Sequence, residues 1–174
     1  FSYSQNITAD TTLAKKHFES GAEYAKKKIY DSSAVYYHKA AIIYKKNNLW
    51  GNYLESERQR GISTNKFQTT DSAISIIKTA LDLTLKNINE NNKYIAKAYI
   101  SLGYRYSNKS QNNLALEYYF KSLKICRELH GEKCLDVAIC YINIGVAYSD
   151  KYELDKALEY SYKSLEIYTE IALV

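Results

Sequence analysis

The spacing of four glycines limits what this chain can fold into more than any other feature of its sequence. These glycines follow one another after 40, 42 and 42 residues, at Gly21, Gly61, Gly103 and Gly145. A small residue stands twelve positions after each of them, at Ser33, Ala73, Ala115 and Ala157. Such a period is typical of stacked structural repeats, in which each repeat contacts only its neighbours. We therefore expect about four repeats, and a function that depends on a binding surface rather than on one reactive side chain.

The composition favours helices throughout. The 174 residues include no proline and only six glycines, so the chain has few residues that interrupt a helix. Apolar residues recur at helical spacing over 33–44, which predicts the second helix of the first pair. The first helix is expected to start near the threonines of 8–12 and to end at about Lys27. Helix caps are expected ten residues after each glycine, at Asp31, Asp71, Asn113 and Asp155.

These patterns predict an all-α chain with a single solenoid domain over residues 1–174. The repeats are expected at approximately 10–49, 50–91, 92–133 and 134–174. Residues 1–9 are expected to be a flexible remnant near a signal-peptide cleavage site. The opening FSYSQN would mean export to the periplasm if it follows a cleaved signal peptide, and the cytoplasm otherwise. No apolar run is long enough to span a membrane.

The net charge of +5 is carried by one half of the chain. Residues 1–87 contain 13 Lys and Arg against 8 Asp and Glu, and residues 88–174 contain 11 against 11. Lysines 26–28 form the densest part of this excess. A solvated helix surface is the favoured interpretation, and an acidic partner or an anionic surface is the alternative. No nucleic-acid-binding motif accompanies the charge, so we expect no nucleic-acid partner.

The sequence contains no arrangement typical of catalysis or of metal binding. Its three histidines fall in separate repeats, and the usual nucleophile, phosphate-binding and metalloprotease motifs are missing. Cys126, His130 and Cys134 have a spacing that resembles part of a zinc site, but Gly131 interrupts the run and a fourth ligand is missing. We expect no enzymatic activity, no metal, no cofactor, and three free structural thiols.

Two segments, 98–125 and 140–167, resemble the tetratricopeptide repeat family. That family has Gly or Ala in the first helix of each pair, Tyr three residues later, and Ala, an aromatic residue and Ala in the second helix. The 42-residue period and the connector LHGEKCLDVA resemble the long kinesin-light-chain type of repeat. Similar arrays precede CHAT peptidase domains in bacterial proteins, and segment 40–61 resembles their lead-in. The second repeat departs from the pattern, with polar residues where the family has apolar ones, at Glu57, Arg60 and Thr64.

The resemblance implies a right-handed superhelical solenoid whose first helices line a concave groove. It implies a non-enzymatic scaffold that binds a protein partner as a peptide or an amphipathic helix. The alternative is an N-terminal sensory or regulatory arm of a larger signalling or CHAT-peptidase protein. Terminal repeats without a polar cap offer a route to self-association. The expected groove residues are Phe18, Arg58, Ile62, Lys97, Ile100, Tyr104, Asn108, Ile139, Ile142, Asn143 and Val146.

Overall fold

The protein is all-α, as the sequence predicts. The computed structural model describes residues 2–173, with side chains from residue 9 onward, and these residues form eight helices and no strand. The helices form two compact units, which divide between Asn89 and Glu90. The prediction of a single solenoid over the whole chain, with a flexible start at 1–9, stays a prediction.

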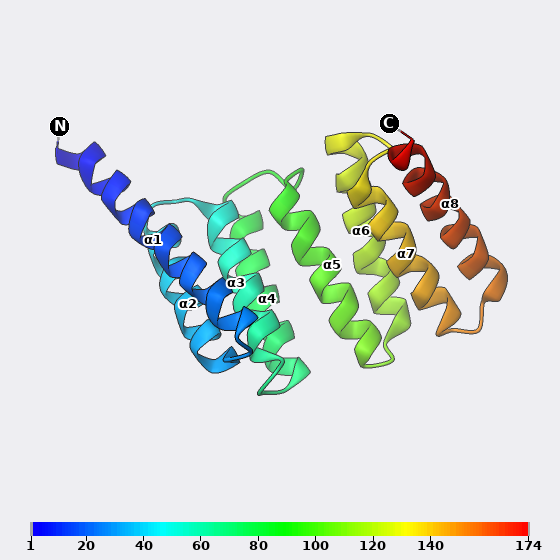
Figure 1. Ribbon diagram of the computed structural model, residues 1–174, viewed down its shortest axis with the longest axis horizontal. Coiled ribbons are helices and arrows are strands. Elements are labelled where there is room, and N and C mark those ends of the chain that lie inside the picture. The colour runs from blue at the N-terminus through cyan, green and yellow to red at the C-terminus, as the bar shows by residue number, and fades with distance from the viewer. Residues whose placement is uncertain (1, 174) are drawn as a thin grey trace. The chain divides into compact units, whose positions relative to one another are not determined.

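The first unit contains two helix hairpins. Helix α1 (Ser2–Lys26) packs on α2 (Tyr30–Lys46), and α3 (Trp50–Thr64) packs on α4 (Thr70–Leu85). Helix α2 also packs on α3, so that the two hairpins share one core (Figure 1). Helix α1 begins well before the threonines of 8–12, where the capping pattern places its start.

The second unit repeats this arrangement. Helix α5 (Lys93–Asn108) pairs with α6 (Asn112–His130), and α7 (Leu135–Ser149) pairs with α8 (Leu154–Ala172). Helix α7 packs on α6 and also touches α5, so the first helices of the two hairpins lie next to each other (Figure 1).

Three of the four repeat glycines, Gly21, Gly61 and Gly103, are needed because a large side chain of the paired helix lies directly against them. A Cβ atom added to Gly61 would lie 2.8 Å from Cγ1 of Ile77, and one added to Gly103 would lie 2.5 Å from Cε1 of Tyr119. Real Cβ contacts are longer than this, so only glycine permits the two helices to come so close. The glycine spacing and the large residue sixteen positions later therefore describe one packing contact.

Buried serines hold the helices of the second unit together. Ser122 of α6 donates its hydroxyl to the backbone oxygen of Ala96, and Ser164 of α8 does the same to Ala138, both at 3.0 Å. Both serines are almost fully buried. Because each serine hydroxyl donates a hydrogen bond to the neighbouring helix, burying it does not carry the free-energy cost of an unpaired polar group.

Three of the four hairpin turns use the same backbone motif. Seven residues after the glycine, Lys28, Ser110 and Tyr152 adopt left-handed φ angles of 60°, 57° and 60°. In the first turn, Lys28 N donates to Ala25 O at 3.0 Å and Ile29 N donates to Tyr24 O at 3.0 Å. This is the Schellman motif, which satisfies the last carbonyls of the first helix.

The predicted helix caps are wrong by two residues. The N-cap positions of α2, α4, α6 and α8 are Ile29, Thr69, Gln111 and Glu153. Among these four, only Thr69 caps its helix with its side chain, whose hydroxyl oxygen accepts a hydrogen bond from the backbone amide of Ser72 at 3.1 Å. Asp31, Asp71 and Asp155 instead lie in the first turn of their helices, where a negative charge favours the helix dipole.

Candidate functional site

In the first unit, two of the three predicted groove residues are committed to contacts within the protein. The ring of Phe18 on α1 meets the ring of Tyr37 edge to face, with centroids 5.1 Å apart. Arg58 on α3 forms an ion pair with Glu55 at 2.6 Å, and both side chains are mostly buried. Ile62 is half-buried on the same helix. The Arg58 charge is therefore balanced within α3.

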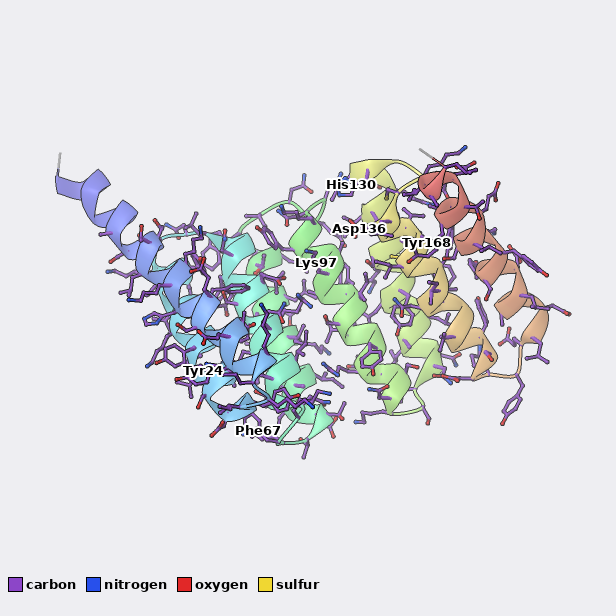
Figure 2. All side chains as sticks on the ribbon, viewed as in Figure 1. Tyr24, Phe67, Lys97, His130, Asp136 and Tyr168 are labelled. Atoms are coloured by element: carbon purple, nitrogen blue, oxygen red, sulfur yellow. The ribbon has the colours of Figure 1, made fainter. Side chains whose placement is uncertain are left out.

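In the second unit, the predicted residues on α5 run along one stripe. Ile100 is half-buried, whereas Lys97 and Asn108 are exposed. Tyr104 lies between Ile100 and Asn108 and has half of its side chain exposed, at 51%. Figure 2 labels Lys97 on α5, in the part of the helix that comes before this apolar stretch. The stripe is therefore charged at one end and apolar in its middle.

The neighbouring helix α7 presents a second apolar stripe. Ile142 and Val146 have 42% and 52% of their side chains exposed, and Ile139 is half-buried. Asn143 donates its side-chain amide to the backbone oxygen of Ile139 at 3.0 Å, which occupies this polar group within the helix. Because α5 and α7 touch, their apolar residues belong to one surface of the second unit.

Polar groups close one end of this surface. The Ser107 hydroxyl of α5 donates to a carboxylate oxygen of Asp150, which follows α7, at 3.4 Å. Burial raises the pKa of the Tyr119 phenol, and the nearby Tyr104 and Asp150 raise it further. Tyr119 therefore stays a neutral, packed side chain close to Tyr104.

A cavity of about 430 Å³ adjoins Val146, and the predicted site does not include its other walls. Gly145 lies on one side, and Leu158 and Ser161 of α8 lie on the other. The cavity exists because Ser161 stands sixteen residues after Gly145, where the other hairpins have Tyr or Ile. That exchange of a large residue for a small one is visible in the sequence and could have indicated the cavity.

The cysteine and histidine run does not come together around a metal position. The imidazole of His130 lies 3.8 Å from the carboxylate of Asp136, and Figure 2 labels both at the same end of α6 and α7. Cys126 is buried, and its hydrogen bond with Cys140, together with burial, raises the pKa of the Cys140 thiol. Within the residues the structure describes, no group of three or more metal-ligating side chains forms, and the cysteines are free thiols.

Comparisons with known proteins agree with this arrangement. Residues 94–170 match the tetratricopeptide repeat family model, and no curated protein matches the chain. A putative kinesin light chain from Podosopora anserina with nearly identical TPR-like repeats has 12% identity and a TM-score of 0.75, over 92% of this chain and 77% of its own. BtubC (BKLC) from P. vanneervenii has 16% identity and a TM-score of 0.67, over 94% and 74%.

A third structure is longer than this chain. The Rap conjugation gene regulator of the plasmid pLS20, solved in complex with the Phr* peptide, has 21% identity and a TM-score of 0.75, over 93% of this chain and 43% of its own. Identities this low establish the fold alone. In fold, the likeness to the Podosopora anserina structure confirms the predicted resemblance to long kinesin-light-chain repeats. The CHAT-type context stays a prediction. The chain therefore has the all-α fold of proteins built from tetratricopeptide repeats, and its match to that family model covers residues 94–170.

Proposed function

We propose that the second unit binds a partner protein through a short apolar peptide or an amphipathic helix, laid across α5 and α7. The observation that carries this proposal is the exposure of Tyr104, Ile142 and Val146 on two touching helices. A contiguous exposed apolar patch is a mark of a binding surface in a soluble protein. The function is that of a non-enzymatic interaction scaffold.

The cavity beside Val146 supports an anchored ligand. Its apolar wall is formed by Leu154 and Leu158 of α8, and its volume of about 430 Å³ suits one large side chain. An aliphatic or aromatic residue of the ligand would enter this cavity, and its neighbours would contact Ile142 and Tyr104. Helix-in-groove recognition uses such anchors at a spacing of three to four residues. The peptide complex of the Rap regulator, which shares the fold, is compatible with this mode.

The test uses a random peptide library selected against the full-length chain, followed by calorimetry with the best peptide. Tyr104→Ala combined with Ile142→Ala should weaken binding at least about 10-fold, since buried apolar anchors of an interface contribute on the order of 1 kcal/mol or more. Val146→Asp should weaken it as strongly, because it places a charge at the mouth of the cavity.

Val35→Asp is the matched control. Val35 lies on α2 with 52% of its side chain exposed, the same fraction as Val146, but it is not part of the proposed surface. Its substitution should leave the peptide Kd unchanged, and circular dichroism should show the same helix content for all variants. Equal weakening by Val35→Asp, or unchanged binding by both groove variants, would contradict the proposal.

The alternative of a sensory or regulatory arm of a larger protein stays a prediction. The Rap regulator, a gene regulator of which this chain spans less than half, shows that the fold occurs inside longer regulatory chains. A peptide-binding surface on the second unit is compatible with either context. None of the described helices is long and apolar enough to cross a membrane.

A further inference from the structure

The second hairpin lacks a ring pair that the other three hairpins share. In those three, a tyrosine three residues after the glycine stacks on a tyrosine twelve residues later. The centroids lie 5.2 Å apart for Tyr24 and Tyr36, 5.4 Å for Tyr106 and Tyr118, and 5.6 Å for Tyr148 and Tyr160. In α3 and α4 the same two places hold Thr64 and Ile76. Two aromatic rings are therefore replaced by two smaller side chains in the first unit.

The neighbouring positions change in the same way. In the second unit, the ring of Tyr160 also contacts Phe120 of α6 at 6.0 Å and Tyr141 of α7 at 5.8 Å, between centroids. Counted from the repeat glycines, the counterparts of Phe120 and Tyr141 in the first unit are His38 and Glu57. Four rings that fill this space in the second unit thus correspond to one imidazole and three non-aromatic side chains in the first.

The space left by these rings is a cavity. A volume of about 310 Å³ lies between α2, α3 and α4, and His38, Glu57 and Ile76 all line it. Its volume is at the lower end of the range for small-molecule sites, about 300 to 1,000 Å³. The groove residues Arg58 and Ile62 do not line it, so this cavity is separate from the proposed peptide surface.

The charged groups of the cavity are arranged to present hydrogen-bond donors. Glu57 is buried, with 7% of its side chain exposed, and its two oxygens are occupied by His38 Nδ1 at 2.8 Å and by Arg60 Nη1 at 2.7 Å. Lys45 lines the same cavity, lies 5.9 Å from the ring centroid of Tyr53, and forms no ion pair within the described part of the chain. Lys45 and the N–H groups of Arg60 that Glu57 does not use are therefore donors available to an anion in this cavity.

The second unit has a cavity beside its ring cluster, and the cationic groups of that cavity pair with carboxylates. Its volume is about 280 Å³, and it includes Arg127 and Tyr141, the counterparts of Lys45 and Glu57. There Arg127 pairs with Glu132 at 2.6 Å, and Lys133 pairs with Glu170 at 2.8 Å. Of the two cavities, only that of the first unit therefore has a cationic donor, Lys45, that pairs with no carboxylate in the described part of the chain.

We propose that the cavity of the first unit binds a small carboxylate that carries an aromatic ring. The ring would take the space that Tyr160 and its neighbours fill in the second unit, against Ile76 and Tyr53. The carboxylate would accept hydrogen bonds from Lys45 and from the remaining N–H groups of Arg60, and charge-assisted bonds of this kind are among the strongest in proteins. Such a group is supplied either by a free aromatic acid or by the C-terminal aromatic residue of a peptide.

The test uses the full-length chain and four probes. Phenylacetate carries the ring and the carboxylate, phenylacetamide lacks the charge, and the peptides Gly-Gly-Phe and Gly-Gly-Phe amide repeat that comparison for a chain terminus. Binding is followed by NMR amide shifts. We expect an acid probe to cause saturable shifts of the backbone amides of Arg60 and Ile76, with a Kd of about 1 mM or tighter. The amide of Val146 should not shift, and the uncharged amide probe should cause no saturable shifts.

Two variants and a control complete the experiment. Ile76→Tyr restores the ring that the other hairpins have and should abolish binding by filling the cavity. Lys45→Glu should weaken binding at least about 10-fold, because it removes the charge-assisted bond. Lys46→Glu changes the neighbouring exposed lysine, which pairs with Asp10 at 3.2 Å and does not line the cavity, and should have no effect.

The outcomes separate the sources of the ligand. Saturable binding of phenylacetate supports a free acid, and binding of Gly-Gly-Phe alone supports a peptide terminus. The proposal is overturned if neither acid binds, if the amides bind as tightly as the acids, or if Lys45→Glu binds as well as the wild type. Lys45 is exposed, so its substitution tests the proposal even if Ile76→Tyr prevents folding.

Discussion

Gly103 shows how a single residue controls the distance between two helices. The Tyr119 ring occupies the place where a side chain at Gly103 would begin, and Tyr119 itself is buried at 2% exposure. The ring cannot move outward without losing its packing, and it cannot move inward without meeting the α5 backbone. The glycine therefore sets the spacing of α5 and α6.

Gly103→Ala is expected to destabilise the protein by about 1 to 3 kcal/mol, because overpacking outweighs the gain of up to about 1 kcal/mol in helix propensity. Urea denaturation followed by circular dichroism measures this. Gly145→Ala is the matched control, since its Cβ would lie 3.2 Å from the nearest atom, the backbone oxygen of Ala157. A smaller loss of stability for Gly103→Ala than for Gly145→Ala would contradict the role given to Tyr119.

Among the elements, α8 has a face that its counterpart α6 does not expose. Leu158 and Leu165 have 56% and 59% of their side chains exposed. The residues 42 positions earlier, Leu116 and Leu123, are only 7% and 4% exposed, in the helix on which α7 packs. The sequence of α8 is therefore suited to pack against a further helix.

We expect a second copy of the chain to cover this face, with α8 against α8. Helix α1 is a poor partner, because it has the exposed Lys16 and Glu23 at the places where α7 has Cys140 and Ala147. The double substitution Leu158→Ser and Leu165→Ser should lower the association constant of the dimer by about 10-fold or more. Each substitution reduces the apolar area that the dimer interface can bury.

Sedimentation equilibrium measures this association. Leu13→Ser is its control, because Leu13 is 46% exposed and lies on α1, which belongs to the other unit. A wild-type chain that stays monomeric at protein concentrations of about 100 μM would contradict self-association through α8, because a stable homodimer forms well below that concentration.

The sequence predicted the hairpins but not the cavity of the first unit, for a physical reason. The glycine at Gly103 and the ring at Tyr119 are sixteen residues apart, so one repeat contains both partners of the contact. The cavity of the first unit depends on His38 and Glu57, which come from different repeats. Glu57 stands out in the sequence as a departure from the repeat pattern, but the pattern does not place His38 opposite it.

The predicted positions of the helix caps are wrong for a different reason. The turns end the first helices through a left-handed residue, which is usually glycine, but here that residue is Lys28, Ser110 or Tyr152. Without a glycine signal, the sequence pattern places the starts of α2, α6 and α8 two residues too late. The groove residues were placed through the family resemblance, and their role in binding stays a prediction.

For the whole molecule, the charge follows the division into units. The 13 basic and 8 acidic residues of 1–87 fall in the first unit, and the balanced 11 and 11 of 88–174 fall in the second. The family match over 94–170 also lies within the second unit. The second unit therefore has its own core, its own family signature and no net charge.

Residues 90–174 are expected to fold when expressed alone, because the buried side chains of α5 to α8 pack largely on one another. Circular dichroism should show a helical protein, and urea should unfold it in one cooperative transition. Residues 112–174 are the control, since they lack α5 and leave Tyr119 and Ser122 uncovered. A helical, cooperative control fragment, or an unfolded 90–174, would contradict the independence of this unit.

The shared left-handed turn residue has a consequence for engineering. Lys28, Ser110 and Tyr152 have the same backbone geometry in turns far apart along the chain, and none is a glycine. A left-handed side-chain-bearing residue is strained by on the order of 1 kcal/mol relative to glycine. Because distant sites combine additively, three exchanges to glycine would raise thermal tolerance together, and none of the three residues lines the cavity of the first unit or the cavity beside Val146. The molecule thus has three turn positions at which an exchange to glycine is expected to relieve backbone strain.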